Sequence, residues 1–157
     1  MSALTTKADP NEQRITEIKA LVDSLKRETL FNNIETDFNL TLPNPAAAFK
    51  ISEGQYLISI NKSIFGSLSE AAQNFIGFHE LGHIYLRHSD IPSEIKNRYE
   101  VELEADIFAA YAYIKFAVID QRIFDFIDTI ASKKGTNPPG EKRAQHILNI
   151  LKIKQKP

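Results

Sequence analysis

The feature that most constrains this chain is the run SEAAQNFIGFHELGHIYLRH at residues 69–88, which contains His79-Glu80-Leu81-Gly82-His83. If this run is helical, His79 and His83 lie on one face, one turn apart. Two imidazoles placed in this way can bind one zinc ion, each at about 2.0–2.1 Å. Glu80 points about 100° away from His79, where it can accept a proton from water without ligating the metal. The rest of the chain must bury this helix and bring further ligands to it.

The composition is that of one ordinary globular domain. The chain has 157 residues, of which 43% are hydrophobic and 25% charged, with a formal net charge of −1. These values exclude disorder throughout and give no general attraction to nucleic acid or anionic membranes. Because there is no cysteine, any metal must be held by histidine and carboxylate. We expect a single domain over residues 1–157, with a flexible tail at 1–9.

Neither a signal peptide nor a membrane span is predicted. The polar N-terminus, MSALTTKADPNEQR, lacks the apolar core that a signal peptide requires. The most apolar stretch, residues 105–130, is interrupted by charged residues too often to supply the roughly 20 apolar residues of a membrane span. We therefore expect a soluble, cytoplasmic protein with no membrane partner.

The patterns of apolar residues predict about five helices and one small sheet. The expected helices cover residues 10 to about 30, 67 to about 90, 93 to about 116, 119 to 133 and 141 to 153. Two β-prone runs flank a turn containing Gly54 and predict a hairpin of residues 48–52 and 56–61. Residues 32–46, with two prolines, are expected to form a loop or a short extended segment. The predicted fold is α+β, mostly α, with a small antiparallel sheet before the helix of residues 69–88.

A third metal ligand must come from elsewhere in the chain. Glu102 and Asp106 are four residues apart on the next predicted helix, which can pack antiparallel to the first. Glu102 would complete a zinc site of two histidines and one glutamate, with an open position for water. Asp106 would accept the free N–H of His79 and fix its tautomer. Glu100 remains an alternative ligand.

Two further residues near the motifs are assigned to other roles. His88 lies about 140° from His83 round a regular helix, so it is expected at the surface or behind the ligands rather than on the metal. Glu104 is displaced by about 200° from Glu102 and is expected to be solvated or ion-paired.

The motifs resemble those of zincin metallopeptidases of the gluzincin type. Residues 78–83 followed by 102–110 are similar to the H-E-x-x-H helix of these enzymes and to the next helix, which carries a glutamate ligand. The ImmA/IrrE-like and Lit-like peptidases are the nearest soluble groups, and the HtpX-like group shares E-x-x-A-D-x-F-A. Residues 136–143 are similar to the T-H-P-x-x-x-R stretch of the HtpX-like group, with Asn137 in place of histidine. Metzincins are excluded, since they need histidine where the chain has Ser89.

The resemblance implies a zincin-like fold and a zinc-dependent peptide hydrolase. Glu80 would take the proton of a zinc-activated water as the water attacks a peptide carbonyl, and then pass it to the leaving amine. The strand at 56–61 is a candidate sheet edge to which an extended peptide adds. Candidate donors to the developing oxyanion are Tyr111, Tyr113 and His146.

Three functional hypotheses follow from these residues. The first is a soluble zinc metalloendopeptidase acting on a protein or peptide; in ImmA/IrrE-like proteins the substrate is typically a helix-turn-helix repressor. The second is a non-catalytic, zinc-stabilised regulatory protein that binds a protein partner, although such a site has no use for Glu80. The third, a helical interaction module without metal, requires both motifs to be coincidence.

Overall fold

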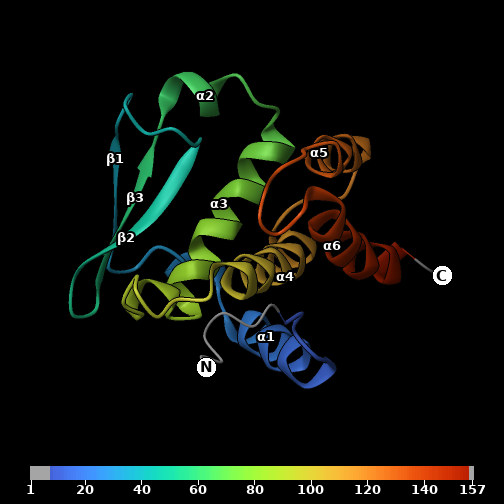
Figure 1. Ribbon diagram of the computed structural model, residues 1–157, viewed down its shortest axis with the longest axis horizontal. Helices are drawn as coiled ribbons and strands as arrows, with labels where there is room; N and C mark the ends of the chain where they lie inside the picture. Colours follow the sequence, from blue (N-terminus) through green and yellow to red (C-terminus); the bar gives the residue numbers. More distant parts are fainter. Residues whose placement is uncertain (1–7, 156–157) are drawn as a thin grey trace.

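The helix that carries the pentapeptide runs through the middle of the molecule, with a sheet on one side and helices on the other (Figure 1). This helix is α3 (Glu70–Tyr85), and the computed structural model describes residues 8–155 around it. The other helices of the described residues are α1 (Glu12–Ser24), α2 (Lys62–Gly66), α4 (Arg98–Phe116), α5 (Gln121–Ala131) and α6 (Gly140–Gln155). The prediction of an α+β fold that is mostly α is confirmed.

The sheet has three strands in the order β1–β3–β2, with β1 at Ile34–Phe38, β2 at Ala46–Ser52 and β3 at Gln55–Ile60. β2 and β3 form the predicted hairpin, and Gly54 in its turn has a φ of 73°, which glycine adopts without steric cost. β1 pairs with β3 in parallel, so the sheet is mixed, and the prediction of a purely antiparallel sheet is wrong. Of the two alternatives for residues 32–46, the short extended segment is confirmed by β1, whose sequence, IETDF, is mostly polar and exposed.

Three helices begin two to five residues later than predicted, because other side chains cap them. Asn11 caps α1, Ser69 rather than Ser67 caps α3, and Asn97 rather than Ser93 caps α4. In each case the side-chain oxygen accepts a hydrogen bond from the backbone N–H three residues further on. α1 also ends well before residue 30, and α2 was not predicted.

The close packing of α3 against α4 sets the positions of the candidate site residues. Gly82 of α3 faces Phe108 of α4, and a Cβ added at Gly82 would lie 3.1 Å from the Phe108 side chain. Gly77, on the same helix, has open space at the corresponding position. The glycine at position 82 therefore allows the two helices to approach where both motifs lie.

The first described residues are attached to the helices. Of the tail expected at residues 1–9, residues 1–7 lie outside the part of the chain that the structure describes. Asp9 accepts a hydrogen bond from the hydroxyl of Tyr99 in α4 at 2.7 Å and pairs with Lys142 of α6 at 3.1 Å. These contacts fix the position of Asp9 against two helices.

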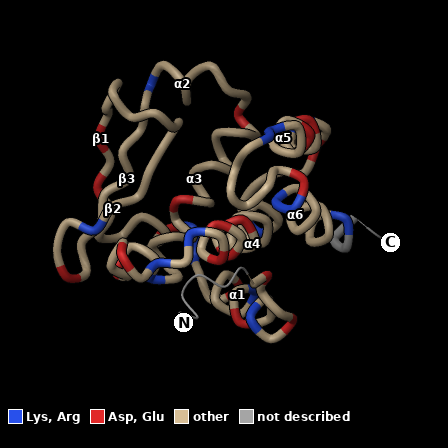
Figure 2. The backbone as a smooth tube through the Cα atoms, viewed as in Figure 1, with Lys and Arg blue, Asp and Glu red and all other residues tan. Residues whose placement is uncertain are grey.

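Charges of both signs are intermingled over α1, α4, α5 and α6 (Figure 2), in keeping with the small net charge. None of the helices within residues 8–155 combines the length and the apolar character that a membrane crossing demands.

Candidate metal centre

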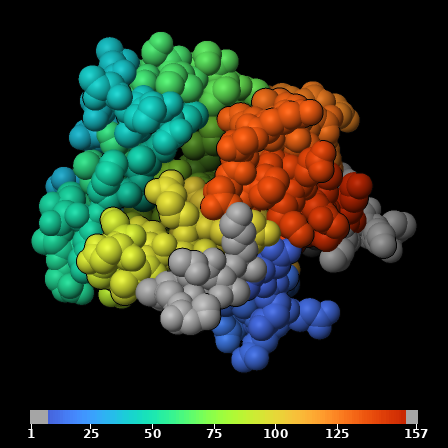
Figure 3. Space-filling view, viewed as in Figure 1, coloured from blue at the N-terminus to red at the C-terminus, as the bar shows by residue number. Residues whose placement is uncertain are grey.

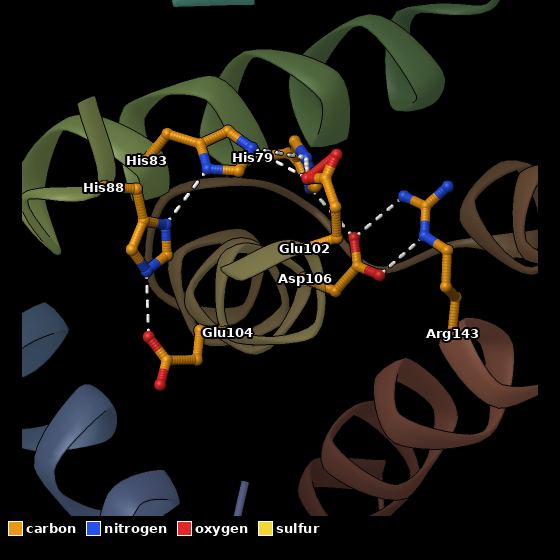
Figure 4. A network of polar contacts seen from close by, with 7 residues as sticks. All are labelled: His79, His83, His88, Glu102, Glu104, Asp106 and Arg143. Carbon is orange, nitrogen blue, oxygen red and sulfur yellow. Dashed lines mark hydrogen bonds and ion pairs between the residues drawn. The ribbon is translucent and has the colours of Figure 1, made fainter. Parts of the chain in front are cut away.

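Three side-chain atoms from α3 and α4 converge on one point. The Nε2 atoms of His79 and His83 are 3.1 Å apart. The carboxylate oxygen Oε2 of Glu102 lies 3.2 Å from the first and 2.9 Å from the second. Figure 4 shows the two imidazoles projecting from α3 toward Glu102 on α4. The structure thus brings together the residues that the two motifs singled out.

The distances and the chemistry of this donor set fit a tetrahedral zinc ion. Donors at about 2.0–2.1 Å from such an ion lie roughly 3.3 Å from one another, and the observed separations are shorter by at most a few tenths of an ångström. In the neutral form of His79 the ring proton lies on Nδ1 toward Asp106, so Nε2 of His79 and Oε2 of Glu102 both present lone pairs. A cation between them removes the repulsion of converging lone pairs.

Glu80 lies beside this donor set and not within it. A donor atom of Glu80 lies within 4.8 Å of donor atoms of both histidines, which makes Glu80 a geometric alternative to Glu102 as third ligand. Glu102 fits better, since its oxygen is at 2.9 and 3.2 Å from the imidazole nitrogens. Glu100, the alternative drawn from the sequence, lines a separate cavity with Arg14 instead of the cavities that contain Glu80.

Asp106 and Arg143 hold the imidazole of His79 from behind. Oδ1 of Asp106 is 2.8 Å from Nδ1 of His79, so the imidazole donates its proton there and keeps Nε2 free. Arg143 of α6 donates to both oxygens of Asp106, at 2.8 and 2.9 Å. We name this pair the Asp106 network. The sequence assigned Asp106 to this contact but did not point to Arg143, although Arg143 is the arginine of the stretch 136–143 that is similar to T-H-P-x-x-x-R.

His88 and Glu104 lie behind the other imidazole. His88 is buried, with 3% of its surface exposed, and its Nδ1 is 3.0 Å from Nδ1 of His83. Its Nε2 is 2.8 Å from Oε1 of Glu104, and Arg14 of α1 donates to both oxygens of that carboxylate. The surface alternative for His88 is therefore wrong, and so is the solvated alternative for Glu104.

The ionisable groups of the site are perturbed by burial and by one another. Burial raises the pKa of Glu102, but the facing imidazoles outweigh burial and hold this pKa well below its usual range. Burial lowers the pKa of His83. Burial also lowers the pKa of His79, but Glu102 and Asp106 outweigh burial and raise it to about 10. A proton and a cation would compete for the same nitrogen of His79.

Glu80 is buried and poised near neutral pH. Burial raises the pKa of its carboxyl to about 7, while His79 and the backbone N–H of Ala48 in β2 act in the opposite direction. A carboxyl with such a pKa can both accept and return a proton at neutral pH.

Two cavities meet at Glu80 and Glu102. The smaller, of about 230 Å³, lies between β2 and α4 and includes Ala46–Ala48 and His83. The larger, of about 720 Å³, extends along α3 toward α5 and includes Phe75, Phe126 and Arg143. Figure 3 shows the hollow between the sheet on one side and α5 and α6 on the other. The candidate centre therefore opens into two adjoining cavities.

The three candidate oxyanion donors lie away from these cavities. Tyr113 is buried and packs edge-on against Phe78, and the charges acting on Tyr111 are those of α1. His146 lies 3.4 Å from Asp9. Arg98, at the start of α4, lines both cavities together with Glu80 and Glu102. Sequence reasoning did not single it out, because a lone arginine at a helix start carries no motif.

The edge of the sheet that faces the centre is β2. The prediction that residues 56–61 form the edge is wrong, since β3 pairs with strands on both sides. β2 is the other outer strand of the described sheet, and its residues Ala46–Ala48 line the smaller cavity together with Glu80, so this edge lies beside the candidate centre.

One comparison with known proteins gives a match for this chain. The sequence model of one family, described as Peptidase U49, matches residues 2–151, which include every site residue described above. No curated protein and no solved structure matches the chain.

Proposed function

The chain belongs to the peptidase U49 family, and on that premise we propose that it is a zinc-dependent metalloendopeptidase that hydrolyses peptide bonds of a protein substrate. Family membership supports the peptidase activity. Zinc dependence rests on the convergence of His79, His83 and Glu102 within 3.2 Å of one another, which is the observation that carries the proposal.

In this proposal each residue of the centre has a defined role in peptide hydrolysis. His79, His83 and Glu102 hold the ion, which supplies a Lewis acid and makes water nucleophilic at neutral pH. Glu80 accepts the proton of the attacking water and passes it to the leaving amine, a task suited to a carboxyl whose pKa is about 7. Arg98 supplies a positive charge to the oxygen on which negative charge develops.

The substrate binds along β2 as a further strand. Peptides commonly add to an exposed sheet edge through backbone hydrogen bonds, and the outer edge of β2 lies beside Glu80. The larger cavity, with Phe75 and Phe126 among polar residues, receives a side chain on one side of the scissile bond. The resemblance to ImmA/IrrE-like peptidases adds a cytoplasmic helix-turn-helix repressor to the substrates worth testing.

The test compares the wild-type chain with Glu80→Gln. Both are purified without chelators, their zinc content is measured, and both are expressed in cells whose proteins are then compared for specific cleavage products. We expect about one zinc per chain in each and a cleavage product only with the wild type. Glu80→Gln keeps the size of the side chain and the ligands, so it separates hydrolysis from metal binding.

Two results would contradict the proposal in different ways. Less than about 0.2 zinc per chain in the wild type would count against the metal centre. If Glu80→Gln kept its zinc and also its biological effect, the effect would come from binding a partner, and the non-catalytic regulator would be the correct function.

A further inference from the structure

The ligand His83 is in contact with a second histidine that the proposed mechanism does not use. His88 follows α3 after Arg87, whose φ of 66° places it in the left-handed region. This conformation ends the helix and turns the chain back, so His88 lies against His83 instead of about 140° away from it. A non-glycine residue in this region is uncommon and requires the surrounding contacts to maintain it.

The contacts of His88 continue across the molecule. From His83 the hydrogen bonds run to His88, from His88 to Glu104 on α4, and from Glu104 to Arg14 on α1. Figure 4 shows His83, His88 and Glu104 linked in this order. We name His88, Glu104 and Arg14 the His88 network.

The order of these groups determines where each proton lies. Glu104, paired with Arg14, is a carboxylate and can only accept, so Nε2 of His88 carries the proton that lies between them. Nδ1 of His88 is then an acceptor, and Nδ1 of His83 donates to it at 3.0 Å. His83 consequently presents the lone pair of Nε2 toward His79 and Glu102.

The two ligand imidazoles are thus supported in equivalent ways from opposite sides. The Asp106 network holds His79 directly and ends on α6. The His88 network holds His83 through one additional imidazole and ends on α1. Both end on an arginine that binds a carboxylate through two nitrogens, an arrangement that fixes orientation as well as charge.

We propose that His88 is a positioning residue for the metal centre, which holds His83 in the tautomer that presents Nε2 to the ion. This inference rests on the proposed metal site. Glu104 and Arg14 maintain the proton of His88 on Nε2, and through it they connect the N-terminal helix α1 to the ligands. If His88 only filled space in the interior, an apolar ring at position 88 would leave the affinity for zinc unchanged.

The first experiment measures the zinc dissociation constant of His88→Phe and His88→Asn by competition with a chromogenic chelator. Phenylalanine fills the space without an acceptor, so we expect its dissociation constant to rise about 10- to 100-fold. Asparagine places its amide oxygen near the position of Nδ1, so it restores most of the affinity. His146→Phe, which changes a histidine outside the site, is the matched control and leaves the affinity at the wild-type value.

A second measurement uses the wild-type chain, so its result does not depend on whether a variant folds. In the zinc-loaded wild-type chain with ¹⁵N-labelled histidine, we expect a protonated Nδ1 on His83 and a protonated Nε2 on His88. A proton on Nδ1 of His88, or ligation of zinc by Nδ1 of His83, would overturn the inference.

The two proposals fail in distinguishable ways. A wild-type chain that binds no zinc overturns the proposed function and this inference with it. A wild type that binds zinc, together with a His88→Phe variant that binds it equally tightly, overturns the role of His88 alone.

Discussion

Arg143 of α6 closes a two-point contact on Asp106 of α4, with Nε donating to Oδ2 at 2.8 Å and Nη2 donating to Oδ1 at 2.9 Å. Burial raises the pKa of Asp106, but the guanidinium of Arg143 outweighs burial and keeps that pKa below its usual range. The orientation of His79 therefore depends on a residue of the last helix.

Replacement of Arg143 by leucine leaves the buried carboxylate of Asp106 without its arginine, with the imidazole of His79 as its remaining partner. We expect Arg143→Leu to lower the free energy of unfolding by about 3–5 kcal/mol, measured by urea denaturation. Lys142→Leu, the adjacent and exposed cation, is the matched control and costs less than about 1 kcal/mol. The double variant Arg143→Leu/Asp106→Leu recovers part of the loss; an additive loss would argue against the pair.

A side chain at position 82 of α3 is predicted to destabilise the protein. In Gly82→Ala the new methyl group meets Phe108 at 3.1 Å, so we expect a loss of about 1–3 kcal/mol despite the better helix propensity of alanine. Gly77→Ala is the control on the same helix; it has open space and gains up to about 1 kcal/mol. Equal effects of the two substitutions in thermal unfolding would contradict this account of the helix contact.

Arg98 is predicted to act on the rate of hydrolysis and not on stability. We expect Arg98→Met to lower kcat by about 100-fold, because it removes a positive charge from the point where the two cavities meet. Lys96→Met is the matched control, since Lys96 lines only the smaller cavity. A change confined to KM would place Arg98 in substrate binding instead.

Removal of the metal is predicted to destabilise the fold. A ligand present at 100 times its dissociation constant stabilises the folded state by about 2.7 kcal/mol, so chelation should lower the melting temperature by roughly 5–10 °C. His79→Ala, which lacks one ligand, should melt at the same temperature with and without the chelator. A wild-type chain that is indifferent to the chelator would contradict the metal centre.

The ion pairs of Asp9 predict a small dependence of stability on pH. The hydroxyl of Tyr99 lowers the pKa of Asp9 below its ordinary value of 3.8, against the opposing effect of burial. The carboxylate therefore stabilises the fold above that value, and this contribution is lost as the pH falls through the lowered pKa. Because Asp9 is partly exposed, we expect less than about 1 kcal/mol. The free energies of unfolding of wild type and Asp9→Asn should differ at pH 7, and the difference should shrink as the pH falls below 3.8.

The parts of the centre that follow helical periodicity could be predicted from the sequence. His79 and His83 repeat at one turn of a helix, and so do Glu102 and Asp106, so local geometry alone placed each pair on one face. Their convergence required only that two successive helices pack against each other.

The remaining parts depend on tertiary contacts that no local pattern records. Arg14 and Arg143 approach the site from helices far away in the sequence. The place of His88 depends on the left-handed conformation of Arg87, and that of β1 on its pairing with β3. Propensity and periodicity describe neighbours along the chain, so they give no information about contacts between residues that are distant in the sequence.

The residues of the two networks are spread over most of the sequence, and this affects when the centre can form during synthesis. All three proposed ligands lie within residues 79–102, but the residues that support them extend from Arg14 to Arg143. A nascent chain leaving the ribosome contains both histidines and Glu102 well before α6 has been translated. His79 acquires its fixed orientation only after Arg143 emerges, so the order of translation itself delays the ordered centre until α6 has been made.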